Sequence, residues 1–224
     1  MYAVLGGIYG ALLSVMNLFN AQLSAVYGNW GSTVMIHAVG LLVLLPLAFT
    51  WGRPKAPAPW YLYGGGLIGI VTVTCCNLAI GGIGVTANLV IMLLGQLTCS
   101  TLIDQFGLFG ARQVKLSAAR LVSLLVIAAG DLVMLLWAGS SAGEGNTSTL
   151  LAVLTSFLSG FSMVFARISN ARLAEKSGLG FSTVMNYVTG LAGSFLIFAC
   201  MGLHLETAFP APGQSITIYL GGAM

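Results

Sequence analysis

Long apolar runs separated by short breaks dominate this sequence. A helix needs about 20 mostly apolar residues to cross roughly 30 Å of hydrocarbon, and seven runs meet that requirement. They are Tyr2–Val26, Ser32–Trp51, Trp60–Ile80, Val85–Gln105, Leu116–Trp137, Leu150–Leu173 and Phe181–Leu203. An eighth run opens near Ser215 and covers about half a crossing by Met224. The pattern predicts an all-α, polytopic integral membrane protein.

The breaks between the runs contain residues that end helices. Tight glycine turns are predicted at 27–31, 81–84 and 177–180. The prolines of segment 52–59 cannot continue a helix. All four tryptophans fall at the ends of runs, where an amphipathic ring prefers the membrane interface.

The composition supports the same class. Hydrophobic residues make up 58% of the 224 positions and charged residues 6%, with a mean hydropathy of +0.97. A soluble domain carries roughly a quarter charged residues, so soluble enzymes and nucleic-acid binders are excluded. We find no phosphate-binding loop, dinucleotide fingerprint, zinc spacing, or paired nucleophile and base, and therefore expect no enzyme, cofactor or metal.

The placement of the basic residues predicts the orientation. All eight lie in or near the connections on one side of the membrane, and the opposite connections (27–31, 81–84, 138–149 and 203–214) carry none. The eight are Arg53, Lys55, Arg112, Lys115, Arg120, Arg167, Arg172 and Lys176. Because cytoplasmic loops are enriched in Lys and Arg, we expect a cytoplasmic N-terminus in the inner (plasma) membrane.

The sequence also contains an internal repeat. An offset of 150 positions aligns residues 20–41 with residues 170–191 without a gap, with ten of twenty-two positions identical. The matches include Asn20 with Asn170, Gly28 with Gly178, Ser32-Thr-Val-Met35 with Ser182-Thr-Val-Met185 and, at a slightly larger offset, Tyr63-Gly-Gly65 with Leu220-Gly-Gly222. Shared Asn, Gly, Ser and Thr do not follow from an apolar composition alone.

The first unit holds five spans, so the second unit starts on the opposite side of the membrane. The predicted organisation is a five-span repeat at 1–138, an outer loop at 139–149, and the start of an inverted, incomplete repeat at 150–224. Inverted repeats are a transporter architecture, with the binding site near the midplane at the repeat interface.

Three segments carry a family resemblance: Asn20-Ala-Gln-Leu23, Gly95-Gln-Leu97 and Ile103-Asp-Gln-Phe-Gly-Leu-Phe-Gly110. With these, the chain resembles the YdcZ-like family of the drug/metabolite transporter superfamily, in a fused two-repeat form. The resemblance implies a ten-span exporter of small molecules. Second copies of the Gly-Gln-Leu and Ile-Asp-x-Phe-Gly segments are absent, so we expect this sequence to be either part of a longer protein or a gene fragment.

Polar residues recur along faces of the predicted spans. We expect these stripes, and Asn170 as the repeat of Asn20, to line a pathway for substrate or ion. The stripes are Ser14, Asn17, Asn20 and Ser24 in span one, Thr33 and His37 in span two, and Asn88, Gln96, Ser100 and Asp104 in span four. The alternative is that they join helices by hydrogen bonds worth about 0.6 kcal/mol each.

Asp131 is the sharpest single candidate. It follows Arg120 by eleven positions, about 16 Å of helix, and so lies near the midplane. An intramembrane carboxylate is by default a functional hypothesis, such as a proton or cation site. A neutral, hydrogen-bonded Asp131, or one facing a wet outer vestibule, stays open as an alternative.

Three further residues have competing interpretations. His37 could titrate near neutral pH, but its repeat partner is Tyr187, which favours a packing role. Asp104 ends span four and could pair with a terminal charge or cap a loop. Arg167 could attract an anionic substrate or extend towards the headgroups.

Together these observations predict a secondary transporter that exports a small metabolite or lipophilic compound by alternating access. The expected partners are that small-molecule substrate, a proton or cation, and the lipid bilayer, with no nucleic acid. A homodimer or a complementing membrane subunit is a further candidate. The alternative function is a non-transporting membrane scaffold or assembly partner.

Overall fold

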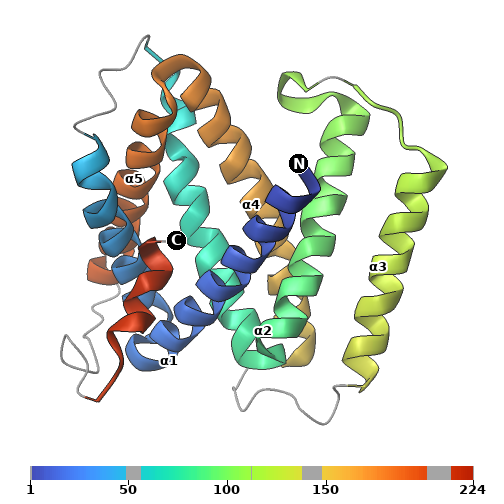
Figure 1. The fold of residues 1–224 in the computed structure, drawn as a ribbon, viewed down its shortest axis with the longest axis horizontal. Coiled ribbons are helices and arrows are strands. Elements are labelled where there is room, and N and C mark those ends of the chain that lie inside the picture. Colours follow the sequence, from blue (N-terminus) through green and yellow to red (C-terminus); the bar gives the residue numbers. More distant parts are fainter. Residues whose placement is uncertain (1, 49–56, 112, 138–147, 201–212, 224) are drawn as a thin grey trace. The chain divides into compact units, whose positions relative to one another are not determined.

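The computed structural model describes residues 2–48, 57–111, 113–137, 148–200 and 213–223 (Figure 1). These residues form helices and short connections, and no strand occurs among them. The elements are α1 (Tyr2–Ala48), η1 (Trp60–Gly64), α2 (Gly65–Phe106), η2 (Leu108–Gly110), α3 (Ala118–Trp137), α4 (Thr149–Ser177), α5 (Leu179–Cys200) and η3 (Ile216–Ala223). The predicted all-α class is confirmed.

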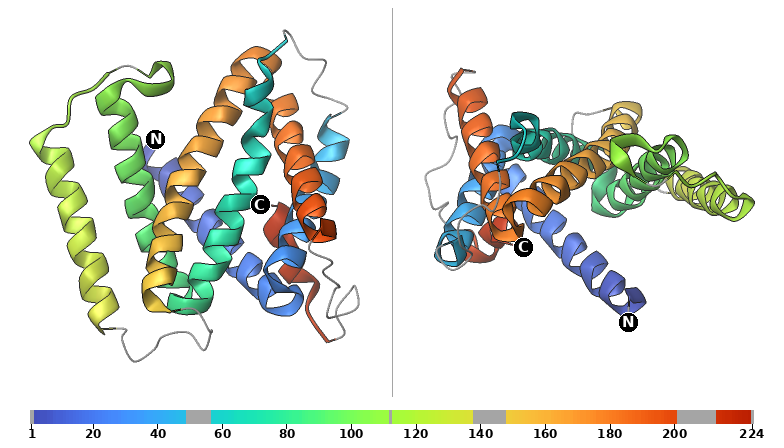
Figure 2. Two further views of the ribbon diagram at one scale, coloured as in Figure 1. Left: turned by 180° about the vertical axis from the view of Figure 1, so that it is seen from behind. Right: turned by 90° about the horizontal axis from the view of Figure 1, so that it is seen from above.

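Two glycines divide the long helices α1 and α2. α1 contains 47 residues, about 70 Å at helical rise and twice a hydrocarbon core. Gly28 interrupts it with φ 71° and ψ 170°, and Gly84 interrupts α2 with φ 78° and ψ 168°. Glycine adopts this backbone conformation without a Cβ penalty. Both predicted glycine turns are therefore present, and α2 runs down and back as a hairpin (Figures 1 and 2).

A third glycine separates α4 from α5. Gly178 has φ 90°, and its N–H donates to the Ala174 carbonyl at 2.8 Å. Gly178 lies 150 positions after Gly28, so the two repeats turn at equivalent residues. Gly107, with φ 60°, ends α2 in the left-handed conformation common after helix C-termini.

Four helical segments of the described chain are long and apolar enough to cross a membrane. They are Val4–Pro46, Trp60–Phe106, Thr149–Ser177 and Leu179–Cys200. The first two contain 43 and 47 residues, enough for two crossings each. α3, with 20 residues, covers the predicted fifth span. The protein is thus a polytopic membrane protein.

The chain forms two compact units. The first combines Met1–Ile70 with Ser169–Met224, and the second is Val71–Ile168. In the first unit, α1 packs against α5 and η3. The second contains most of α2, α3 and the N-terminal part of α4. Each unit takes helices from both sequence repeats, so the division by contacts differs from the predicted repeat boundaries, which stay a prediction.

Apolar side chains face outward on the helices, as lipid requires. Leu125 and Val126 of α3 are more than half exposed, whereas Asp131 of the same helix is buried. Some predicted features lie outside the described residues: Arg53, Lys55, Arg112 and most of the outer loop 139–149.

Candidate substrate and ion pathway

Within the first unit, equivalent residues of the two repeats contact each other reciprocally. A Cβ on Gly190 would overlap the His37 ring, and a Cβ on Gly40 would overlap the Tyr187 ring. Gly40 and Gly190 are 150 positions apart, as are His37 and Tyr187. The two rings meet edge to face with centroids 6.3 Å apart. The second half of α1 therefore packs against α5, the helix that is its equivalent in the second repeat.

Two asparagines extend this reciprocity. A Cβ on Gly65 would overlap the Asn170 amide oxygen, and a Cβ on Gly221 would overlap that of Asn20. The next glycines behave alike: Gly66 abuts the carbonyl of Asn186, and Gly222 abuts that of Ile36. Gly65 thus corresponds to Gly221, whereas the sequence alignment paired it with Gly222. That pairing is wrong by one residue, because adjacent glycines give an alignment no side chain to fix the register.

The amide oxygens of these asparagines are buried acceptors. Among the described residues, neither Asn20 Oδ1 nor Asn170 Oδ1 has a hydrogen-bond partner, and both atoms are buried. Asn170 Nδ2 donates to Asn186 Oδ1 at 2.9 Å. A buried acceptor without a donor costs about 1–3 kcal/mol. Both oxygens are therefore candidate acceptors for a donor on a bound molecule.

The other span-one and span-two candidates have local partners. Asn17 is buried, and its Nδ2 donates to the Leu13 carbonyl at 2.9 Å. His37 is buried, with Nδ1 at 2.8 Å from the Thr33 carbonyl. Because a carbonyl only accepts, Nδ1 carries the proton in this contact. The packing of His37 against Gly190 and Tyr187 agrees with a structural role.

In the second unit, Asn88 joins three helical segments. Its side chain is fully buried, and its Nδ2 lies 3.0 Å from Cys76 Sγ. Ser156 Oγ donates to the backbone carbonyl oxygen of Asn88 at 2.9 Å. Asn88 Oδ1 has no hydrogen-bond partner within the described chain. This atom is a third buried acceptor at a predicted pathway position.

Sequence reasoning missed a serine stripe on α4. Ser156, Ser159 and Ser162 are all buried, and Ser162 pairs with Thr72 at 2.8 Å between the hydroxyl oxygens. The spacing of three residues was the available signal, since it places the hydroxyls along one helix face.

Close helix packing positions Gln96 beside Arg167. A Cβ on Gly95 would overlap the Phe157 carbonyl, and a Cβ on Gly160 would overlap that of Met92, so the helices approach at two small residues. Arg167 Nη1 donates to Gln96 Oε1 at 3.0 Å. Arg167 thus reaches α2, a contact that neither sequence interpretation included.

The predicted Gln96, Ser100 and Asp104 stripe diverges in the structure. Gln96 contacts α4, whereas Ser100 and Asp104 face α3. Steps of four residues advance by about 400°, so eight residues rotate the stripe by roughly 80° around the helix. The residues of this stripe therefore face two different helices, α4 and α3.

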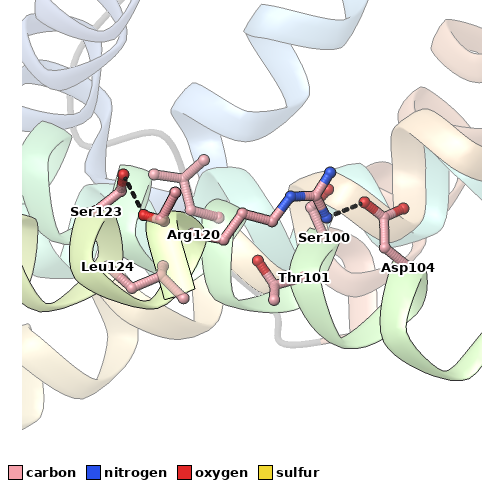
Figure 3. A pocket seen from close by; sticks show the side chains of 8 residues that line it. Ser100, Thr101, Asp104, Arg120, Ser123 and Leu124 are labelled. Atoms are coloured by element: carbon pink, nitrogen blue, oxygen red, sulfur yellow. Dashed lines mark hydrogen bonds and ion pairs between the residues drawn. The ribbon is translucent and has the colours of Figure 1, made fainter. Parts of the chain in front are cut away.

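Asp104 and Arg120 form an ion pair within an open pocket between α2 and α3 (Figure 3). Arg120 Nη1 donates to Asp104 Oδ2 at 2.8 Å. We call this the α2–α3 pocket; its volume is about 330 Å³. α2 supplies Leu97, Ser100, Thr101 and Asp104, and α3 supplies Ala119, Arg120, Ser123 and Leu124.

Asp131 lies on the same face of α3 as Arg120, because eleven residues are close to three helical turns. Its side chain is 4% exposed, and neither carboxylate oxygen has a partner among the described residues. A charged carboxylate without partners is costly at membrane depth. The site thus suits a proton, which neutralises the group, or a cation, which balances it. No cluster of three metal-ligating side chains occurs within the described residues.

A family model described as "Putative inner membrane exporter, YdcZ" matches residues 1–133, more than half of the chain. The chain belongs to the YdcZ family. Searches of curated proteins and of solved structures gave no significant match. The resemblance predicted from the Gly95–Gly110 region is thereby confirmed.

Family membership indicates that this YdcZ-family protein is a transporter of the exporter type in the inner membrane. Seven of the eight predicted pathway residues lie inside the matched region, and Asn170 lies beyond it. The roles of all eight stay predictions.

Proposed function

We propose that this YdcZ-family protein is a secondary exporter that moves a small metabolite or lipophilic compound by alternating access between inverted repeats. One observation carries the mechanism: the repeats contact each other reciprocally, with Gly40 against Tyr187 and Gly190 against His37. Transporters with inverted repeats bind substrate near the midplane and expose it alternately to each side. The two repeats here correspond to 1–138 and 150–224.

The unpaired amide oxygens support a substrate role for the asparagines. Asn20, Asn88 and Asn170 each keep a buried Oδ1 without a donor among the described residues. An N–H or O–H group of a substrate would satisfy an acceptor of this kind, either at Asn20 and Asn170 of the first unit or at Asn88 of the second. The remaining candidates, Asn17, His37, Gln96 and Asp104, have partners within the chain and are proposed as pathway-lining groups.

Asp131 is the proposed coupling site for a proton or cation. Its burial with no hydrogen-bond partner among the described residues supports this role, since protonation and deprotonation would each change the local charge balance. The cytoplasmic N-terminus is part of the same proposal and rests on the one-sided placement of Lys and Arg.

Proton-coupled flux tests the proposal. The protein is reconstituted into liposomes that contain a pH-sensitive dye, and the internal pH is followed on addition of ethidium and then of a panel of metabolites. We expect Asp131→Asn to abolish the pH response while Asp131→Glu keeps part of it. Gly130→Ala is the matched control, because a Cβ there meets no atom within 4 Å.

Unchanged coupling in Asp131→Asn would remove Asp131 from the mechanism. Absence of flux in the wild-type protein, combined with stable binding to another membrane protein, would favour the scaffold function. For the topology, a cysteine introduced at Ser141 should react from outside and one at Gln113 from inside; the reverse pattern contradicts the proposed orientation.

A further inference from the structure

The α2–α3 pocket lies at the membrane interface end of its two helices. Arg120 is the third residue of α3, and Asp104 lies two residues before the end of α2. α3 has 20 residues, about the number that spans the hydrocarbon core, so both charges lie at headgroup depth. The pocket, at about 330 Å³, falls within the size range of small-molecule sites.

The ion pair in this pocket is accessible from outside the protein. The side chains of Arg120 and Asp104 are 42% and 30% exposed, respectively. Exposed pairs of this kind contribute little to stability. Breaking the contact between Arg120 and Asp104 therefore costs little free energy, and a molecule that carries both charges could bind to each of them in its place.

Two hydroxyl groups in the pocket have no hydrogen-bond partner in the described part of the chain. Hydroxyls elsewhere on these helices bond to their own backbone: Thr98 donates to the Leu94 carbonyl at 2.8 Å and Ser123 to the Ala119 carbonyl at 2.9 Å. By contrast, Ser100 and Thr101 show no hydrogen bond within the described residues. Both line the pocket beside the guanidinium of Arg120 (Figure 3).

The pocket changes from polar to apolar with depth. Leu124 lies four residues beyond Arg120, about 6 Å deeper, and Leu97 lies seven residues before Asp104, about 10 Å deeper. A charged end, a middle that holds Ser100 and Leu124, and an inner aliphatic end at Leu97 match the order of a phospholipid's headgroup, ester region and acyl chain.

We propose that the α2–α3 pocket is a binding site for a zwitterionic phospholipid of the phosphoethanolamine type. The phosphate binds the guanidinium of Arg120, which presents several N–H donors suited to phosphate oxygens. The primary ammonium donates to the carboxylate of Asp104. Ser100 and Thr101 donate to ester oxygens, and the chain follows Leu97 and Leu124.

The adjacent carboxylate selects against other lipids. An anionic phospholipid such as phosphatidylglycerol would gain Arg120 but meet the negative charge of Asp104. Phosphatidylcholine carries both charges, but its quaternary ammonium has no N–H to donate to the carboxylate. Phosphatidylethanolamine satisfies both members of the pair.

Native mass spectrometry of the full chain tests this assignment. The protein is delipidated in detergent and titrated with short-chain phosphatidylethanolamine, phosphatidylcholine and phosphatidylglycerol. We expect the wild type to bind phosphatidylethanolamine about tenfold more tightly than the other two, as the loss of one charge-assisted hydrogen bond implies. Equal binding of all three lipids overturns the proposal.

The variants separate the two charges. Asp104→Asn should weaken phosphatidylethanolamine binding about tenfold and strengthen phosphatidylglycerol binding, because Arg120 is released. Arg120→Gln should weaken both. Arg172→Gln is the matched control, since Arg172 forms the other described ion pair, with Glu175 at 3.3 Å on α4. Unchanged lipid preference in Asp104→Asn and Arg120→Gln overturns the assignment.

Two further arms guard against misfolding and against a soluble ligand. The exchanged pair Asp104→Arg with Arg120→Asp keeps both charges and should retain preference for phosphatidylethanolamine; a loss of preference together with unchanged thermal unfolding contradicts the site. Soluble O-phosphoethanolamine should not displace the lipid at equal concentration. Displacement would assign the pocket to a soluble zwitterion and overturn the lipid proposal.

Discussion

Helices approach closely at glycine residues in both compact units. In the first unit these close contacts occur at equivalent residues of both repeats, whereas in the second unit a close contact of one repeat has no counterpart in the other. In the first unit, Gly66 abuts the Asn186 carbonyl and Gly222 abuts the equivalent carbonyl of Ile36. In the second, Gly160 abuts the Met92 carbonyl, whereas its counterpart Gly10, which belongs to the first unit, meets no described atom within 4 Å. The same repeated residue can therefore lie at a helix crossing in one copy and have no described neighbour at its Cβ position in the other.

The units also differ in the groups that they bury. The contacts between repeats in the first unit involve glycine, asparagine and aromatic rings. The second unit buries the carboxylate of Asp131, whereas the described ion pairs, Asp104 with Arg120 in the second unit and Arg172 with Glu175 in the first, are partly exposed. Neutral, close packing thus characterises the contact between the repeats, and a buried carboxylate at Asp131, the proposed coupling residue, distinguishes the second unit within the described chain.

The largest effect is expected where a glycine meets backbone atoms. Gly66→Ala places a methyl group against the Asn186 carbonyl and the Gly190 amide nitrogen, which cannot move aside independently of α5. We expect a loss of about 3 kcal/mol in the free energy of unfolding, measured in mixed detergent micelles. Gly64→Ala is the control, because a Cβ there meets nothing within 4 Å. Equal effects of the two substitutions would contradict the reciprocal packing.

The contrast between Gly160 and Gly10 can be tested directly. Gly160→Ala drives a methyl group into the Met92 carbonyl and should lower the free energy of unfolding by about 2 kcal/mol. Gly10→Ala should leave it unchanged or raise it by about 0.5–1 kcal/mol, because alanine favours helix more than glycine does. A similar loss for both would show that Gly10 is also at a helix crossing.

A smaller loss of stability is expected at Gly190, and a second substitution should recover part of it. The methyl group of Gly190→Ala meets the His37 ring, which is held by its contact with the Thr33 carbonyl. We expect a loss of about 1–2 kcal/mol from overpacking. Combining it with His37→Ala should recover part of this loss, as shown by a double-mutant cycle of unfolding free energies. Additive losses would indicate that the two residues do not touch.

The smallest effect concerns the interhelical hydroxyl pair. Thr72→Val removes the contact with Ser162 and should cost about 0.6 kcal/mol, the average for such bonds in membranes. Thr98→Val is the control, since Thr98 bonds within its own helix to the Leu94 carbonyl. A loss several times larger for Thr72→Val would place this pair among the principal contacts of the second unit.

The helices and their turns could be predicted because their causes are local. An apolar run of about 20 residues indicates a crossing whatever lies beside it. Gly28 and Gly178 mark turns because their positive φ values suit glycine. The repeat at an offset of 150 and the family segments near Gly95 are likewise properties of the sequence itself.

The neighbours of each helix face were decided by the tertiary structure. Sequence spacing placed Gln96 and Asp104 on one stripe, yet Arg167 and Arg120 bind them from different helices. It also missed the buried serines of α4 and paired Gly65 with the wrong glycine. The physical reason is that the lipid-facing and protein-facing sides of a membrane helix are both apolar, so hydropathy reports the crossing but not its partner. Backbone approach at glycine and the matching of polar groups select the partner, and both exist only once the helices have come together.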